Sequence, residues 1–350
     1  MSNQQKALLL DKPAGKLTVG LIDIPGPLPG FVVVEVRAAA LNPLDWIMRD
    51  TGMFVDQWPA ILGNDAAGVV TAVGEGVTNL AVGDRVLHAG SLTEPRMSTF
   101  RQYTVIRAEF AAKVPENVSF DEAATIPSTL ATAVLGMYGP KRRPNGGIAL
   151  TPPWEEGGRG KYAGEPFIVV GGASCVGQFV IQFAKLSGFS PIIATASVHN
   201  EEYLKSVGAT HVIDRNIPAD ELAAAVKEIT DKDVKYAYDA VADATMQSVV
   251  YNLLASGGQL VNVRPAPLDS VKETEDKYIA HVLAGVQRPW NAEVGRGLFA
   301  SLEKYMKDGD VKPTRVELLQ GGLAGIAEGL DKLKKGVSAV KLVARPQDTL

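Results

Sequence analysis

Cysteine, histidine and long hydrophobic runs are all scarce in this chain of 350 residues. Its single cysteine excludes an intramolecular disulfide bond, so nothing ties the fold to an oxidising compartment. A structural zinc site needs about four cysteine or histidine ligands at short spacings. The four histidines do not cluster in that way; they are His88, His199, His211 and His281. The sequence therefore predicts no metal site.

The sequence also lacks the features of a membrane protein or a nucleic-acid-binding protein. No apolar stretch approaches the roughly 20 residues that a transmembrane helix needs. The apolar run that begins at Ala7 is broken by Asp11, which is unlike a secretory signal. The net charge is -4, from 35 Lys and Arg residues against 39 Asp and Glu residues. We therefore expect a cytoplasmic protein with no membrane partner and no nucleic-acid partner.

Short β-branched runs separated by turn glycines dominate the first 125 or so residues. No long helical period interrupts them. This pattern predicts a partly open β-barrel, with strands at 31–36, 68–73, 84–87 and 103–106.

The middle of the chain alternates between apolar strands and amphipathic helices. The run 167–170 is fully apolar, as in a parallel sheet that is covered on both faces. After it, apolar residues recur from Val176 to Phe183 with the spacing of one helix face. Further strands are predicted at 191–195, 211–213, 235–241 and 259–263, and helices at 200–207, 219–229 and 246–254. This alternation predicts an α/β fold with a doubly wound parallel sheet of the Rossmann type.

Two segments complete the predicted organisation. Residues 140–165 are dense in glycine, proline and charge, and predict an insertion without regular structure, either a disordered surface loop or a functional one. The residues from 306 onward return to short strands and turns. We expect 1–125 and 306–350 to form one domain, and 126–305, with the insertion, to form the other.

A glycine-rich loop lies between the apolar strand and the helix that follows it. Small residues allow backbone N–H groups to approach a pyrophosphate at a helix N-terminus, where the helix dipole favours anions. The alternative is a tight turn in a domain that binds no nucleotide. We predict that the loop binds the cofactor pyrophosphate through Gly172, Ala173, Ser174, Cys175, Val176 and Gly177.

The end of the second predicted strand bears on the identity of the cofactor. A site for NAD usually has an acidic residue about 20 positions after the loop, on the ribose 2′-hydroxyl. Here no acid occurs in that stretch, and Arg215 follows the next strand. We therefore expect NADPH, with Ser197, His199 and Asn200 as hydrogen-bonding partners of its 2′-phosphate. Arg215 is expected to stack on the adenine or to pair with the phosphate, and Val198 is a further expected cofactor contact. Capping of the next helix is an alternative role for Ser197 and Asn200.

Several motifs resemble the medium-chain dehydrogenases/reductases along nearly the whole chain. They occupy residues 37–46, 63–70, 82–86, 321–326 and 337–343. The C-terminal pair resembles the fungal branch of trans-acting enoyl reductases of polyketide pathways, including the lovastatin enoyl reductase, and related quinone oxidoreductase-like proteins. The resemblance implies a GroES-like barrel domain, a Rossmann domain and a small conjugated carbonyl or quinone substrate. It also implies a polyketide synthase as a candidate partner.

Departures from the family pattern decide the predicted chemistry. Zinc-dependent members have a cysteine near Leu41 and Asn42, and a His-Glu pair where this chain has Asn64 and Asp65. The lovastatin-type enzyme has a lysine where this chain has Ile47. We therefore expect a zinc-independent reductase that transfers hydride from NADPH to an activated C=C bond. The alternatives are a quinone oxidoreductase, and an NADPH-binding sensor or synthase partner with little catalysis.

The resemblance also implies roles for individual residues. It implies catalytic roles for Asn42, Asp45 and Thr132. It implies further cofactor contacts from Leu44, Asp45, Trp46, Ile47, Ser338, Ala339 and Lys341. Asn262 and Val263 are expected to contact the cofactor because they end the fifth predicted strand, where ligands of parallel sheets bind. It implies substrate contacts from Thr129, Thr132, His281, Val282 and Leu283.

Each of these roles has a structural alternative. Asn42 satisfying a turn, Trp46 in the core and Thr132 bonded within its own helix are the plainer interpretations. For His281 the alternative is a solvent-exposed helical histidine. Tyr103 and Tyr138 are candidate proton donors, and packing is the alternative for both. Related folds often dimerise through the edge of the Rossmann sheet, so a homodimer through the strand around Leu260 is a further candidate.

Overall fold

Two structural units, each built on its own sheets, make up the chain. The structure is a computed structural model that describes residues 3–91, 94–263 and 273–350. Unit 1 comprises Met1–Ser128, Phe299–Gly309 and Pro313–Leu350, and unit 2 comprises Thr129–Leu298 and Asp310–Lys312.

Unit 1 contains a seven-stranded sheet that joins the two ends of the sequence. The strand order is β15-β16-β3-β5-β6-β8, and β7 pairs with β3. Its strands are β3 (Phe31–Ala40), β5 (Asp65–Val73), β6 (Arg85–Ala89), β7 (Tyr103–Arg107), β8 (Ala111–Lys113), β15 (Arg315–Leu318) and β16 (Val340–Ala344). The pairing of β16 with β3 brings residues about 300 positions apart into one sheet.

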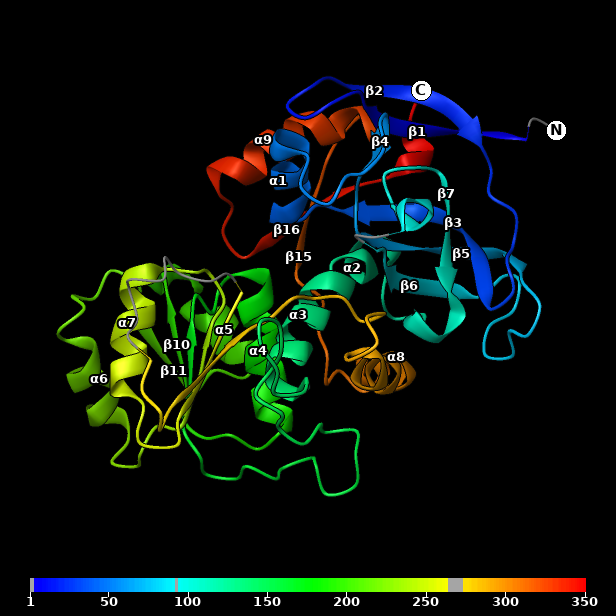
Figure 1. Cartoon of the computed structure of the whole chain (residues 1–350). Helices are drawn as coiled ribbons and strands as arrows, with labels where there is room; N and C mark the ends of the chain where they lie inside the picture. Colours follow the sequence, from blue (N-terminus) through cyan, green and yellow to red (C-terminus); the bar gives the residue numbers. More distant parts are fainter. Residues whose placement is uncertain (1–2, 92–93, 264–272) are drawn as a thin grey trace. The chain divides into compact units, whose positions relative to one another are not determined.

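A smaller sheet and three short helices also belong to unit 1, in addition to the part of α8 (Ala292–Lys307) from Phe299 onward. The sheet has the order β2-β1-β4. Its strands are β1 (Gln4–Leu10), β2 (Leu17–Asp23) and β4 (Ala60–Ile61), and the helices are α1 (Pro43–Thr51), α2 (Phe120–Ala124) and α9 (Ile326–Lys335). Helices α1 and α9 lie side by side (Figure 1), joined by ion pairs from Arg49 to Asp331 and from Lys334 to Asp50, each 2.8 Å long.

The helix α1 follows from signals in its own sequence. Asn42 occupies the N-cap with an extended backbone, and Pro43 fills the first turn, where its missing N–H costs nothing. Gly52 ends the helix in the left-handed conformation, with a φ of 73°. This helix interrupts a region in which the sequence analysis found strands and turns alone.

Unit 2 contains a six-stranded sheet in which every pair is parallel. Its strands are β9 (Phe167–Val170), β10 (Ile192–Ala196), β11 (His211–Asp214), β12 (Tyr236–Asp239), β13 (Gln259–Asn262) and β14 (Tyr278–His281). The order β11-β10-β9-β12-β13-β14 reads 3-2-1-4-5-6 within the unit. This is the doubly wound order of dinucleotide-binding folds, so the predicted Rossmann sheet is confirmed.

Four of the remaining helices follow the alternation predicted for the middle of the chain, and two, at 127–138 and 292–307, lie outside it. The remaining helices are α3 (Pro127–Tyr138), α4 (Cys175–Leu186), α5 (Glu201–Val207), α6 (Leu222–Ile229), α7 (Ala244–Leu253) and α8 (Ala292–Lys307). Residues of α6 and α7, among them Val226 and Val250, pack with Ile168 and Leu260 of the sheet in one buried core. Among the described residues, no helix is both long enough and apolar enough to cross a bilayer.

The insertion at 140–165 has no helix or strand, but it is not a disordered surface loop. Ile148 and Leu150 are buried within it, at 1% and 5% exposure. The ring of Tyr162 stacks on Phe189, with 4.9 Å between the ring centroids and an interplanar angle of 1°. The Tyr162 hydroxyl accepts a 2.8 Å hydrogen bond from the backbone of Thr151. The insertion is therefore a packed layer of unit 2.

The dimer interface predicted around Leu260 is wrong in its location. Leu260 lies in β13, which is paired on one side with β12 and on the other with β14. Its backbone groups are therefore taken within the sheet. The described strands at the two sides of this sheet are β11 and β14.

Candidate functional site

The glycine loop joins the carboxyl end of β9 to the amino end of α4, beside the point where the strand order reverses. Ser174 is the N-cap of α4, and its hydroxyl accepts a 3.0 Å hydrogen bond from the backbone of Gly177. The first turn of a helix leaves backbone N–H groups without partners inside the helix, and the helix dipole adds positive potential there. Ligands of doubly wound sheets bind at this reversal point.

Three positions in the loop have room for glycine alone. A Cβ atom on Gly177 would lie 2.4 Å from the carbonyl oxygen of Gly171, and one on Gly172 would lie 2.8 Å from the Cβ of Ala194. Gly171 has a φ of 74°, which side chains rarely tolerate. The loop therefore forms a close cradle of backbone, which fits the pyrophosphate of a dinucleotide.

Polar residues gather at the ends of the next two strands. Ser197 follows β10, and the backbone N–H of Arg215, which follows β11, donates to the carbonyl of Ala196 over 2.9 Å. Val198, His199 and Asn200 form a single turn after Ser197, in which Val198 and His199 are exposed. Asn200 is 3% exposed, and its amide contacts the His199 ring over 3.2 Å. Ser197, His199 and Arg215 are therefore grouped beyond the carboxyl ends of two neighbouring strands.

A second polar pair ends β13 and β14. Asn262 and His281 are register partners, and Asn262 Oδ1 is bonded to Nδ1 of His281. The predicted alternative of a helical His281 is wrong, because the residue ends a strand and is half-buried. Burial lowers the pKa of His281, which favours the neutral ring. Val263 and Val282 follow these strands, and Val282 donates its N–H to Asn262 over 3.0 Å.

The other predicted residues of unit 2 lie on α3 and after β14. Thr129 is buried and Thr132 is partly buried on α3, and the carbonyl of Thr132 accepts a 2.9 Å hydrogen bond from the Tyr238 hydroxyl. Leu283 is partly buried after β14. The hydroxyl of Tyr138 bonds Ser187 over 2.7 Å inside the unit, which fits a packing role better than proton donation.

In unit 1, an amide, a carboxylate and an ammonium group form a buried cluster, which we call the amide cluster: Asn42, Asp65 and Lys341. Asn42 Nδ2 donates to Asp65 over 2.8 Å, and the Lys341 ammonium donates to Asn42 Oδ1 over 2.7 Å. Lys341 also pairs with Asp65 over 3.1 Å. The other oxygen of Asp65 accepts the backbone N–H of Ser128 over 2.6 Å. All three side chains are at most 7% exposed.

The amide cluster fixes the orientation of the Asn42 amide. A lysine ammonium can only donate and a carboxylate can only accept, so Oδ1 must face Lys341 and Nδ2 must face Asp65. One hydrogen of Nδ2 is donated to Asp65, and the second has no acceptor among the described residues.

Asp45 and His88 are buried beside this cluster. Asp45 is 1% exposed and accepts the backbone N–H of Asn42 over 2.7 Å. Burial raises the pKa of Asp45 to about 7, and the negative charge of Asp65 adds to the rise. Burial lowers the pKa of His88 to about 4, so its ring is neutral at physiological pH.

The remaining predicted residues of unit 1 flank the cluster. Leu44, Trp46 and Ile47 are partly buried on α1, and the Lys334 ammonium lies 5.4 Å from the centre of the Trp46 ring. Ser338 is exposed and Ala339 is buried just before β16. The role of Asp65 is not among the sequence predictions, although Asn64 and Asp65 together mark a departure from the family pattern.

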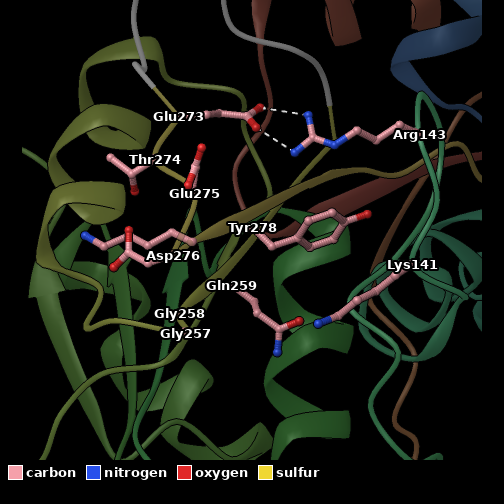
Figure 2. Close-up of a pocket in the computed structure, with 11 residues that line it drawn as sticks. Lys141, Arg143, Gly257, Gly258, Gln259, Glu273, Thr274, Glu275, Asp276 and Tyr278 are labelled. Carbon is pink, nitrogen blue, oxygen red and sulfur yellow. Dashed lines mark hydrogen bonds and ion pairs between the residues drawn. The ribbon is translucent and has the colours of Figure 1, made fainter.

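A charged cavity of about 500 Å³ lies elsewhere in unit 2, at the amino ends of β13 and β14. Figure 2 shows Arg143 facing Glu273, with two hydrogen bonds of 2.6 and 3.2 Å between them. Gln259 and Tyr278, the first residues of the two strands, also line it. Its location at the amino ends sets it apart from the glycine loop, which lies at a carboxyl end.

Two family profiles match this chain, one in each unit. The profile described as the alcohol dehydrogenase GroES-like domain matches residues 28–116. The profile described as zinc-binding dehydrogenase matches residues 175–270.

Relatives match over nearly the full length. A dehydrogenase of Emericella nidulans is 34% identical over 97% of this chain and 98% of its own length. The enoyl reductase component of lovastatin nonaketide synthase from Aspergillus terreus is 32% identical over 90% of this chain and 88% of its own. A trans-enoyl reductase of a Penicillium species is 30% identical over 98% of both chains.

Solved structures share the fold. A putative zinc-dependent alcohol dehydrogenase from Rhizobium etli CFN 42 superposes with a TM-score of 0.81 at 24% identity, covering 99% of both chains. The quinone oxidoreductase from Coxiella burnetii gives 0.72 at 22% identity, covering 97% of this chain and 98% of its own.

The donor groups of the amide cluster do not fit the zinc that two of these descriptions mention. Zinc sites in proteins use thiolate, imidazole and carboxylate ligands. Here both oxygens of Asp65 already accept hydrogen bonds, and an ammonium group lies beside them. Within residues 3–91, 94–263 and 273–350, no three His, Cys, Asp or Glu side chains are grouped to hold a metal ion. We derive no catalytic step through a metal.

Proposed function

We propose that this chain, which belongs to the medium-chain dehydrogenase/reductase family, is an NADPH-dependent reductase of activated carbon–carbon double bonds. Family membership makes the chain an oxidoreductase with a nicotinamide cofactor. The preference for NADPH and the α,β-unsaturated carbonyl acceptor are our proposal. Relatives named as enoyl reductases at 30% and 32% identity support the choice of acceptor.

The observation that carries the proposal is the fixed Asn42 amide. An α,β-unsaturated carbonyl compound becomes an enolate when a hydride reaches its β-carbon, so negative charge develops on the carbonyl oxygen. A preorganised N–H donor in a site without water stabilises such charge, and one donor of this kind lowers the activation barrier by about 2.7–4 kcal/mol. The second Nδ2 hydrogen of Asn42 is a donor whose direction is set by Asp65 and Lys341.

The overall reaction balances with a single cofactor. When bound, NADPH supplies the hydride, and a proton then completes the saturated product. Thr132 is the other proposed catalytic residue, and Asp45, for which a catalytic role was also expected, is proposed to act through Asn42. Asp45 accepts the backbone N–H of Asn42 and so holds the start of α1 in place, which is a positioning role.

Ser197, His199 and Arg215 support the preference for NADPH. They bring two donors and one cation to the ends of β10 and β11, where the adenosine ribose of a dinucleotide lies in doubly wound folds. Ser197→Asp places a carboxylate there, and we expect the Kd of NADPH to rise at least about tenfold through like-charge repulsion. Ser206→Asp, an exposed change on α5, is the matched control. An unchanged Kd for NADPH in Ser197→Asp contradicts the cofactor assignment.

Turnover with NADPH tests the reaction. Medium-chain enals and enones are compared with 1,4-quinones by following the oxidation of NADPH, which absorbs at 340 nm. We expect the enals or enones to have the higher kcat/KM. A preference for quinones would replace the proposal with the quinone oxidoreductase alternative. NADPH binding without turnover on any acceptor would favour the sensor or synthase-partner alternative.

A polyketide synthase is the partner that the relatives suggest for the same activity. One of them is named as a component of lovastatin nonaketide synthase. We propose that this chain acts in trans on acyl chains held by such a synthase. Co-purification with a synthase encoded beside it tests the partner, and reduction of free enals alone, without any association, counts against it.

A further inference from the structure

A cavity of about 240 Å³ in unit 1 has a buried cation in its wall. Met48 of α1 and the segment that contains Val55, Ile61 and Leu62 give it apolar walls, and Arg101 contributes the cation. Arg101 is 5% exposed.

The guanidinium of Arg101 is only partly satisfied by the protein. Nε donates to the carbonyl of Ser98 over 2.8 Å, and Nη2 donates to the carbonyls of Pro95 and Arg96. Nη1 has no hydrogen-bond partner among the described residues. No described carboxylate pairs with the guanidinium, and burial lowers its pKa to about 10, so the positive charge persists at neutral pH.

Buried charges in proteins are normally paired, because removing an ion from water is costly. The other charged side chains at this cavity are Asp56 and Arg96, and both are exposed at its rim. Arg96 already pairs with Glu94 over 2.6 Å. Arg101 is thus the one buried charge among the described residues that line the cavity, and no described residue supplies an anion to it.

We propose that this cavity binds the carboxylate of an organic acid with a short hydrocarbon chain. The planar guanidinium matches the geometry of a carboxylate, and the apolar walls match a hydrocarbon chain better than the hydration shell of a phosphate. The volume lies at the low end for small-molecule pockets, which favours a short chain. Phe54, 41% exposed with a φ of 62°, lies at the cavity in a conformation that is unusual for a bulky residue.

The proposed carboxylate site is separate from the proposed reductase reaction, so its test measures ligand binding and needs no enzymatic turnover. Isothermal titration calorimetry of the full chain compares hexanoate with hexanamide and 1-hexanol, which keep the chain but lack the charge. We expect hexanoate to bind about 10- to 100-fold more tightly than either, as for a charge-assisted hydrogen bond. Equal affinity for the three, or no binding of hexanoate, overturns the proposal.

Variants identify the residue. Arg101→Met is expected to lose the preference for hexanoate. Arg101→Lys is expected to keep part of that preference, because lysine restores the positive charge but lacks the paired N–H donors of the planar guanidinium. Arg107→Met is the matched control, since Arg107 pairs with Glu94 nearby but does not line the cavity. Loss of hexanoate binding in Arg96→Met but not in Arg101→Met would move the site to the rim and overturn the assignment.

Arg101→Met also removes hydrogen bonds to three backbone carbonyls, so the fold needs its own check. The thermal unfolding midpoint of the variant provides this check. An unchanged midpoint means that lost hexanoate binding comes from the missing guanidinium and not from a disrupted loop. The comparison of hexanoate, hexanamide and 1-hexanol uses the unchanged protein, so it does not depend on any variant. Its result is sufficient by itself to overturn the proposal.

Discussion

Among single residues, Lys341 makes the clearest prediction about stability. It is 3% exposed and neutralises the carboxylate of Asp65, which is fully buried. In Lys341→Met the Asp65 charge stays buried without its partner, and this typically costs about 3–5 kcal/mol of unfolding free energy. Urea unfolding followed by circular dichroism measures the loss.

The matched control is Lys334→Met. Lys334 pairs with Asp50 over a similar distance of 2.8 Å, but it is half exposed, at 52%. Exposed pairs contribute about 0–1 kcal/mol, so this variant is expected to stay near the unchanged protein. Similar losses in both variants would contradict the description of the amide cluster as a buried ion pair.

Asp45 makes a prediction about pH. Its pKa is about 7 in the folded chain against a usual value of 3.8, so the folded state binds the proton more tightly than the unfolded state. Its contribution to stability is therefore complete below about pH 4 and is lost as the pH rises to 7, by up to about 1.4 kcal/mol per pH unit. Asp45→Asn removes this loss, so the variant should be the more stable protein at pH 8.

His88 contributes a slope of the opposite sign. Its pKa of about 4 lies below its usual value of 6.5, so its contribution is complete above pH 6.5 and is lost as the pH falls toward 4. Asp45→Asn leaves this slope in place, and His88→Gln removes it. Urea unfolding of the three proteins at pH 5 and pH 8 separates the two groups. An Asp45→Asn stability difference that does not change with pH contradicts the raised pKa.

At the scale of elements, five of the six parallel strands were predictable, and β14 and the helix α1 were not. The strands β9 and β10 are short apolar runs that only a doubly covered sheet can bury, so composition indicates them directly. The strand β14 has four residues, Tyr278–His281, with a mixed pattern that carries little periodicity. The helix α1 was missed although its cap and its terminal glycine were visible, because nine residues give a weak period.

The packed insertion makes the prediction at this scale. Its ring Tyr162 also meets Tyr236 edge-on, with centroids 5.9 Å apart, in addition to its stacking on Phe189. Tyr162→Ala removes these ring contacts and the hydrogen bond to Thr151, and it should loosen the segment around residue 162 even though backbone hydrogen bonds to Leu186 and Ser187 remain. Trypsin is expected to cut the variant faster after Arg142 and Lys161, whereas the bond after Arg143 precedes a proline and resists the enzyme.

Tyr162→Phe is the control for that experiment. It keeps the ring and loses the hydroxyl that accepts the N–H of Thr151. We expect cleavage close to that of the unchanged protein, with a small acceleration from the lost hydrogen bond. Equal cleavage of the alanine variant and the unchanged protein would mean that the ring does not anchor the segment.

For the whole molecule, sequence reasoning reaches the sites that are local and misses those that are assembled. The glycine loop is contiguous, so its residues and its place after an apolar strand are legible in the sequence. The amide cluster joins residues from three distant segments, and Arg101 meets its cavity only after the barrel has formed. Neither periodicity nor residue spacing in the sequence predicts a contact that forms only in the tertiary structure.

The prediction for the whole molecule concerns the C-terminal segment, which belongs to unit 1 together with the N-terminal residues. The strand β16 lies between β15 and β3, and its Leu342 and Val343 are fully buried. A chain truncated after Gly336 loses this inner strand together with Lys341, and we expect its unit 1 to fail to fold. Limited proteolysis and circular dichroism detect the failure, and removal of exposed Leu350 alone is the control. A truncated chain with the original thermal midpoint contradicts the prediction.

The hydrogen bonds between Asn42, Asp65 and Lys341 also constrain how this sequence can change over time. Each side chain supplies what another requires, so replacing Lys341 alone leaves a carboxylate unpaired, and replacing Asp65 alone leaves an ammonium unpaired. A descendant lineage must therefore alter the three positions together, or pass through a poorly folded intermediate. We expect substitutions at these positions to occur as correlated sets, with a neutral pair arising in place of the charged one.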